Sequence, residues 1–168
     1  MPGYIIHIAV AKEYAKKHKI KNVDDFIKGS IAPDFTNDKS TTHYGKSPAY
    51  TNLGNYLKEN TILTDYDKGF FLHLITDYLF YNKYLNDLSK PQIYYDYDFL
   101  NKEIIDKYEI VPPEEIKDKI FFKEGVPKHI SMELVDQMVN DISNMDIDTI
   151  VKEVEKEYRK WNEYKNIV

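Results

Sequence analysis

The stretch DYDKGFFLHLITDYLFYNKYLNDL, residues 65–88, decides the fold class of this chain. Its aromatic and aliphatic residues leave no polar face at helical spacing, which predicts a central buried helix over 65–88. His73 and Asp77 interrupt this apolar stretch four positions apart, so on a helix both project from one face, one turn apart. Because a buried imidazole and carboxylate need partners, the pair predicts a metal site, with a simple imidazole–carboxylate hydrogen bond as the alternative.

The remaining sequence is helical in its periodicity nearly throughout. It predicts an all-α, single compact domain over residues 1–168, built around the central helix. The further expected helices cover 4–18, 23–28, 49–59, 98–108, 129–145 and 147–164. The expected loops cover 35–47, 112–113 and 121–127. Asp65 and Asp67 suit the start of the central helix, and Asp146 or Asp148 can cap the last one.

Composition limits the classes of function open to the chain. A length of 168 residues with a hydrophobic fraction of 42% is typical of one globular domain. The net charge of −5 and the single arginine, Arg159, give no electrostatic signature of duplex nucleic acid binding. The chain has no cysteine, so a metal would be held by imidazole, carboxylate and water. Neither a signal peptide nor a transmembrane segment is expected, which predicts a cytoplasmic protein.

Three further side chains in the first half are capable of binding a metal. His7 lies on an apolar helix, where a lone histidine is more often a hydrogen-bonded core residue. Asp34 follows Pro33, which restricts the residue before it, so the carboxylate is either directed inward by this turn or caps the next one. His43 lies in an expected loop, a common place for functional residues, although a lone histidine there is more often only solvated.

Together, His7, Asp34, His43, His73 and Asp77 provide three imidazoles and two carboxylates. These suffice for one ion, or for two ions bridged by an aspartate, with a position left for water. A metal-bound water with its pKa lowered toward neutrality is a nucleophile for ester or phosphoester hydrolysis, and a free carboxylate can orient or deprotonate it. Such mixed ligands suit several divalent metals, Zn²⁺ among them.

The order and flanking sequence of these residues resemble the zinc-dependent phospholipase C family, in particular its short bacterial branch without a signal peptide. The matching stretches are GSIAPD (residues 29–34), THY (42–44) and FFLHLITD (70–77), preceded by His7. The resemblance covers roughly residues 1–90. It implies an all-α, phospholipase C-like fold, related to that of the helical trinuclear-zinc nucleases. It also implies zinc ligation by all five residues, with Asp77 as the bridging carboxylate and Asp34 as the base or water-orienting group.

The chain departs from the family pattern in three places. Secreted members begin with a tryptophan whose amino group and carbonyl bind zinc, and this chain has no such residue at its start. Lys83 stands where the family has a further histidine, six positions after Asp77. His129 and Glu133 have the spacing of the family's late histidine–glutamate pair but lie farther along the chain, so they are either candidate ligands or an ordinary helix start. These departures predict one or two ions.

These observations predict a metal-dependent hydrolase, with zinc as its expected cofactor, that acts on a small phosphoester through a metal-activated water. A non-catalytic metal-binding or metal-sensing helical domain is the alternative, because some family ligands are missing. A third possibility is a metal-free interaction module that uses the charged helix near the C-terminus. The sequence carries no signal for an oligomeric state.

Overall fold

The computed structural model describes residues 3–85, 90–157 and 159–164. Within these ranges the chain is helical and contains no β-strand, which confirms the predicted all-α single domain. The α-helices are α1 (Tyr4–Lys17), α2 (Val23–Ile31), α3 (Lys39–His43), α4 (Leu53–Glu59), α5 (Asp65–Leu79), α6 (Lys90–Lys107), α7 (Met132–Ser143) and α8 (Ile147–Lys156). Shorter 3-10 turns are η1 (Ala32–Asp34), η2 (Pro48–Tyr50), η4 (Glu114–Lys119) and η5 (Lys160–Asn162), and η3 (Phe80–Tyr84) is a π-helical turn.

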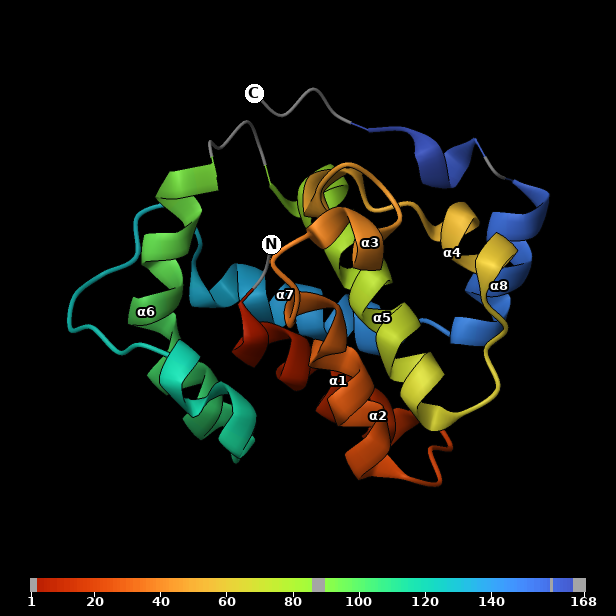
Figure 1. Cartoon of the computed structure of the whole chain (residues 1–168). Coiled ribbons are helices and arrows are strands. Elements are labelled where there is room, and N and C mark those ends of the chain that lie inside the picture. Colours follow the sequence, from red (N-terminus) through yellow and green to blue (C-terminus); the bar gives the residue numbers. More distant parts are fainter. Residues whose placement is uncertain (1–2, 86–89, 158, 165–168) are drawn as a thin grey trace.

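Helix α5 runs through the middle of the molecule (Figure 1). A capping box fixes its start: the Thr64 hydroxyl accepts a hydrogen bond from the Asp67 amide at 3.1 Å, and the Asp67 carboxylate accepts one from the Thr64 amide at 2.9 Å. Every side chain over 71–79 is buried, as predicted for a helix without a polar face. The α-helix ends earlier than predicted, at Leu79, and the predicted positions 86–88 lie outside the described residues.

The other helices enclose α5. Helices α1 and α2 lie along one side of it and α4 and α8 along the other, while α7 packs on α1 and α6 forms an outer edge (Figure 1). Helix α1 is itself buried on nearly all sides, and its residues Ile5, Ile6 and Ile8 are each 1% exposed. A polar side chain on this part of α1 therefore has to find its partners inside the protein.

Helices α2 and α5 approach closely at two glycines. A methyl group at Gly29 would lie 2.1 Å from the carbonyl oxygen of Tyr66, and one at Gly69 would lie 2.0 Å from the carbonyl oxygen of Phe26. Each glycine thus accommodates the backbone of the facing helix. The contact sets the distance between α5 and Ser30, the residue after Gly29.

Replacing Gly69 with alanine is expected to lower the free energy of unfolding by about 2 kcal/mol or more, because the two backbones must separate. A solvent-exposed helical glycine would behave in the opposite way, since alanine favours the helix by about 1 kcal/mol. Urea unfolding of Gly69→Ala beside the neighbouring Lys68→Ala distinguishes the two outcomes. A stabilised Gly69→Ala protein would contradict the close approach.

Several element boundaries differ from the predictions for local reasons. Helix α7 starts at Met132 rather than at residue 129, because the Ser131 hydroxyl caps it by accepting from the Leu134 amide at 3.1 Å. Helix α8 starts as predicted, with Asp146 accepting from the Thr149 amide, but it ends at Lys156. Four further boundaries differ: α6 starts at Lys90 instead of 98, α4 starts at Leu53 instead of 49, α2 ends at Ile31 instead of 28, and α7 ends at Ser143 instead of 145.

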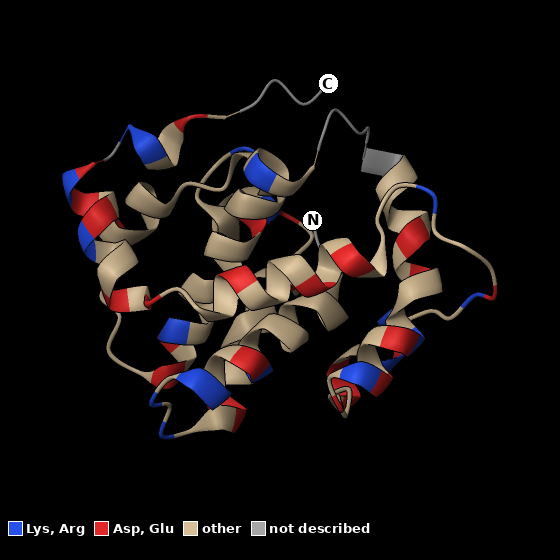
Figure 2. Ribbon diagram, turned by 180° about the vertical axis from the view of Figure 1, so that it is seen from behind, with Lys and Arg blue, Asp and Glu red and all other residues tan. Residues whose placement is uncertain are grey.

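No described helix is both long and apolar enough to cross a membrane. Figure 2 shows basic and acidic residues interspersed around the outside on the side it displays, and acidic positions alone along α7.

Candidate metal centre

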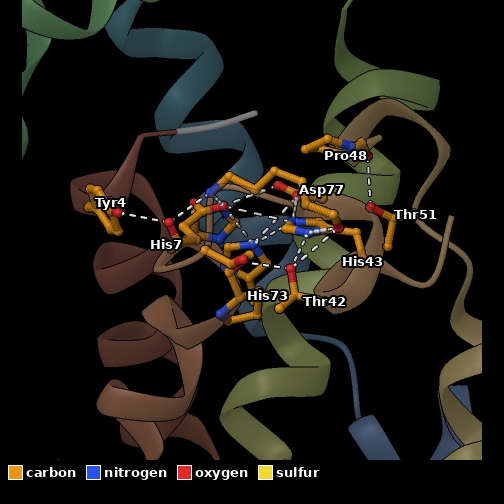
Figure 3. Close-up of polar contacts among 12 residues, drawn as sticks. Tyr4, His7, Thr42, His43, Pro48, Thr51, His73 and Asp77 are labelled. Carbon is orange, nitrogen blue, oxygen red and sulfur yellow. Dashed lines mark hydrogen bonds and ion pairs between the residues drawn. The ribbon is translucent and has the colours of Figure 1, made fainter. Parts of the chain in front are cut away.

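Five buried side chains from four elements meet beside α5 (Figure 3). They are His7 on α1, Asp34 in η1, His43 on α3, and His73 and Asp77 on α5. Each residue is between 0% and 5% exposed. Their ligand atoms form two overlapping groups, His7–His73–Asp77 and Asp34–His43–His73, within each of which all atoms lie within 4.8 Å of one another. The structure thus brings together the five residues singled out in the first half of the sequence.

Helix α5 and turn η1 place three of these side chains. His73 and Asp77 lie one turn apart on the same face of α5, as their spacing predicted. Asp34 ends the 3-10 turn η1, in which Pro33 fixes the backbone, and its side chain is fully buried. The turn therefore directs the carboxylate inward, one of the two orientations that the sequence left open.

His43 reaches the centre from a short helix and not from the predicted loop. The Asp38 carboxylate caps this helix, α3, by accepting a hydrogen bond from the Ser40 amide at 3.0 Å. His43 is the last residue of α3 and is 0% exposed, so it is not the solvated side chain that a polar loop would favour. A single capped turn is enough to direct the ring inward.

Backbone carbonyls fix the tautomers of His43 and His73. His73 Nδ1 lies 2.7 Å from the carbonyl oxygen of Ser30, and His43 Nδ1 lies 3.1 Å from that of Lys39. A carbonyl oxygen can only accept, so Nδ1 carries the proton in both rings. In a neutral ring, each Nε2 then carries a lone pair. Histidines that bind metals through one ring nitrogen typically donate a hydrogen bond from the other one in this way.

When both rings are neutral, the two Nε2 atoms face each other and the carboxylates without a proton to share. They lie 3.2 Å apart, and Oδ2 of Asp77 is 2.9 Å from Nε2 of His43 and 3.4 Å from that of His73. Oδ1 of Asp34 lies 3.7 Å from both. Ligand atoms on a tetrahedral zinc stand roughly 3.3 Å apart, given bonds of about 2.0–2.1 Å. One added proton would satisfy one of these contacts, whereas a cation would satisfy them all.

Asp77 faces two sides. Its Oδ2 points at His43 and His73, and its Oδ1 lies 3.2 Å from Nε2 of His7, whose ring stacks on that of His73 with centroids 3.7 Å apart. A carboxylate that offers one oxygen to each side suits a bridge between two ions. A second ion position would use His7 and one oxygen of Asp77. It has fewer ligands of its own than the position beside His43 and His73.

Unsatisfied polar atoms concentrate in this centre. Seven buried side-chain atoms of the described residues have no hydrogen-bond partner, and five of them belong to it. These five are both ring nitrogens of His7, both carboxylate oxygens of Asp77 and Oδ2 of Asp34. Since buried polar groups are nearly always paired, such a cluster indicates a ligand-binding role.

The charges of the centre perturb its own proton equilibria. Burial, and then the charge of His73, lower the pKa of His7 to about 4, although Asp77 acts against them. Burial also acts to lower the pKa of His73, but the charges of Asp77 and Asp34 outweigh it and raise that pKa. Burial would raise the pKa of Asp77, yet the histidines around it, His73 foremost, hold it well below its usual range. Asp77 is therefore ionised and His7 neutral at neutral pH, as metal ligands must be.

Asp34 contacts two groups outside the set of five. Lys39 Nζ lies 2.8 Å from Oδ1 of Asp34 and 2.7 Å from its carbonyl oxygen, to which the Tyr4 hydroxyl also donates at 3.0 Å. Oδ1 of Asp34 is shared with an ammonium group and lies farther from the imidazoles than the oxygens of Asp77 do. Asp34 is therefore the candidate ligand least closely associated with the other four.

The later candidates lie elsewhere. His129 and Glu133 are both exposed, belong to neither group of ligand atoms, and line a surface cavity of about 440 Å³. The backbone amide of His129 donates to the buried Asp96 carboxylate, which accounts for the position of this segment. Lys83 is exposed, with Nζ 3.8 Å from the Asp141 carboxylate.

Sequence reasoning missed the residues that support the ligands. Ser30 and Lys39 orient the imidazoles through their backbone carbonyls, and a backbone acceptor leaves no trace in residue type. The spacing of Lys39, four positions before His43, is a usable signal only once α3 is recognised as a helix.

Searches of protein-family models, of curated proteins and of solved structures give no match, so the description of this centre rests on its own residues and distances.

Proposed function

We propose that this protein is a metal-dependent hydrolase, with zinc as the expected metal, that acts on a small phosphoester. The observation that carries the proposal is the pair of buried Nε2 atoms of His43 and His73, 3.2 Å apart and facing two carboxylates. The resemblance of residues 1–90 to the zinc-dependent phospholipase C family supports the same reading and suggests a phospholipase C-like fold.

In this proposal, His43, His73 and Asp77 would hold the principal ion, and His7 and Asp77 would hold a second one. Three closely spaced protein ligands with a fourth position left for water are typical of catalytic zinc sites. A bound divalent ion supplies a lowered water pKa and a Lewis acid for a phosphoryl oxygen. Asp34, held by Lys39 through one oxygen and with Oδ2 free, is placed to orient or accept a proton from the attacking water.

Replacing Asp34 with asparagine is expected to lower kcat/KM by about 100- to 10,000-fold, because the amide cannot accept that proton. The test is a panel of phosphomonoesters and phosphodiesters, assayed with zinc-loaded protein. Asp24→Asn, an exposed position on α2, is the matched control and should retain full activity. Turnover that survives Asp34→Asn unchanged would remove Asp34 from the mechanism.

A non-catalytic metal-stabilised domain is the second candidate, and burial favours it. The side chains of Asp34, His43, His73 and Asp77 are each 0% exposed, so substrate would reach the centre only after local movement. Closed, fully buried sites are typical of structural metals. This alternative requires stable metal binding and no turnover of any ester in the panel.

A further inference from the structure

We infer that Lys39 forms an anion subsite at the edge of the metal centre, where it pairs with a negatively charged phosphoryl oxygen of the substrate. The inference rests on the proposed function and specifies the chemistry by which that site would recognise an ester of phosphate.

Lys39 is a charged group that contacts the centre and is itself partly exposed to solvent. Its ammonium lies 2.8 Å from Oδ1 of Asp34, the oxygen that also faces Nε2 of His43 and His73 at 3.7 Å. Its side chain is 24% exposed, whereas that of Asp34 is 0% exposed. A ligand that approached the centre from this edge would therefore meet the ammonium before the carboxylate.

The charge of the centre depends on this lysine. Two carboxylates and Lys39 sum to −1 when the imidazoles are neutral, and one divalent ion brings the total to +1. A buried centre of net positive charge favours an anion, because the desolvated charge needs compensation. Without Lys39 the same loaded centre would be neutral. The ammonium has three N–H donors, of which Asp34 accepts two, so an anion can pair with Lys39 while the lysine still holds Asp34.

The subsite can be tested without disturbing the ligands. Lys39 orients His43 through its backbone carbonyl, which a side-chain substitution retains. Helix α3 is capped by Asp38, so its start does not depend on the lysine side chain. Lys39→Met therefore removes the ammonium and preserves most of the stem, while Lys39→Arg restores the charge.

The experiment compares four zinc-loaded proteins: wild type, Lys39→Met, Lys39→Arg and Lys68→Met. For each protein, the zinc content and melting temperature are measured, and calorimetry gives the dissociation constant of inorganic phosphate. Lys68 is the matched control, because its ammonium also pairs with an aspartate carboxylate, that of Asp65, at 3.4 Å. Lys39→Met should keep its zinc and bind phosphate at least about tenfold more weakly, as expected for a lost charge-assisted hydrogen bond. Lys39→Arg should recover most of the affinity, and Lys68→Met should match wild type.

The failures are distinguishable. The subsite is overturned, and the metal centre left intact, if Lys39→Met binds phosphate as tightly as wild type does. The same conclusion follows if wild type holds zinc but binds no phosphate. Loss of zinc from Lys39→Met shows that the lysine only supports Asp34, and it also overturns the subsite. A wild type that binds no zinc overturns the proposed function itself.

Discussion

Replacing Asp77 with asparagine is expected to abolish tight metal binding and, with it, the stabilisation of the folded protein by zinc. All three imidazoles contact this carboxylate, at 2.9 Å to 3.4 Å, so its charge is the common element of both ion positions. The same imidazoles hold the pKa of Asp77 well below its usual range, so the uncharged amide is also expected to lower the stability of the metal-free protein at neutral pH. The check is urea unfolding of both proteins with and without zinc.

Asp96 provides the contrasting control. It is another buried aspartate, 2% exposed, but its carboxylate accepts hydrogen bonds from the backbone amides of residues 128–130. Asp96→Asn places an amide donor against these donors and should lower stability by about 2–4 kcal/mol, with zinc or without it. If zinc stabilises Asp77→Asn as much as it stabilises Asp96→Asn, then Asp77 is a structural carboxylate and no metal bridge.

Removing the metal from wild type is expected to lower the melting temperature by roughly 8–16 °C. An ion present at about a thousand times its dissociation constant stabilises the native state by about 4 kcal/mol. In a domain of this length each kcal/mol corresponds to roughly 2–4 °C. Thermal unfolding followed by circular dichroism, before and after dialysis against a chelator, measures the shift.

Two comparisons make this result specific. Added zinc should restore the original melting temperature, and chelation should not change that of Asp77→Asn. A wild-type melting temperature that does not respond to chelation or to added zinc would mean that the cluster is stabilised by protons alone.

Local pattern was sufficient to predict the central helix and the pairing of His73 with Asp77. Both follow from properties within one turn of helix, namely the absence of a polar face and a spacing of four residues. The position of Asp67 at the start of this helix was predicted for the same reason, whereas its part in a capping box was not.

Long-range contacts explain what the sequence did not disclose. The proximity of Gly29 and Gly69, forty positions apart, is a property of two packed helices, and the helix expected over 23–28 stopped short of Gly29. His129 and Glu133 have a ligand-like spacing, but Asp96 on another helix holds their segment at the surface. The end of α5 at Leu79 was not predicted, because neither glycine nor proline marks residues 80–85.

Elemental analysis of the purified protein is the most direct test of the metal centre. Wild type and the exposed-site control His129→Ala should each carry one to two equivalents of divalent metal after reconstitution with zinc, and His73→Ala should carry close to none. His73 belongs to both groups of ligand atoms, so its loss removes a ligand from each. A wild-type protein without metal after reconstitution, or a His73→Ala protein with the same metal content as wild type, would contradict the account.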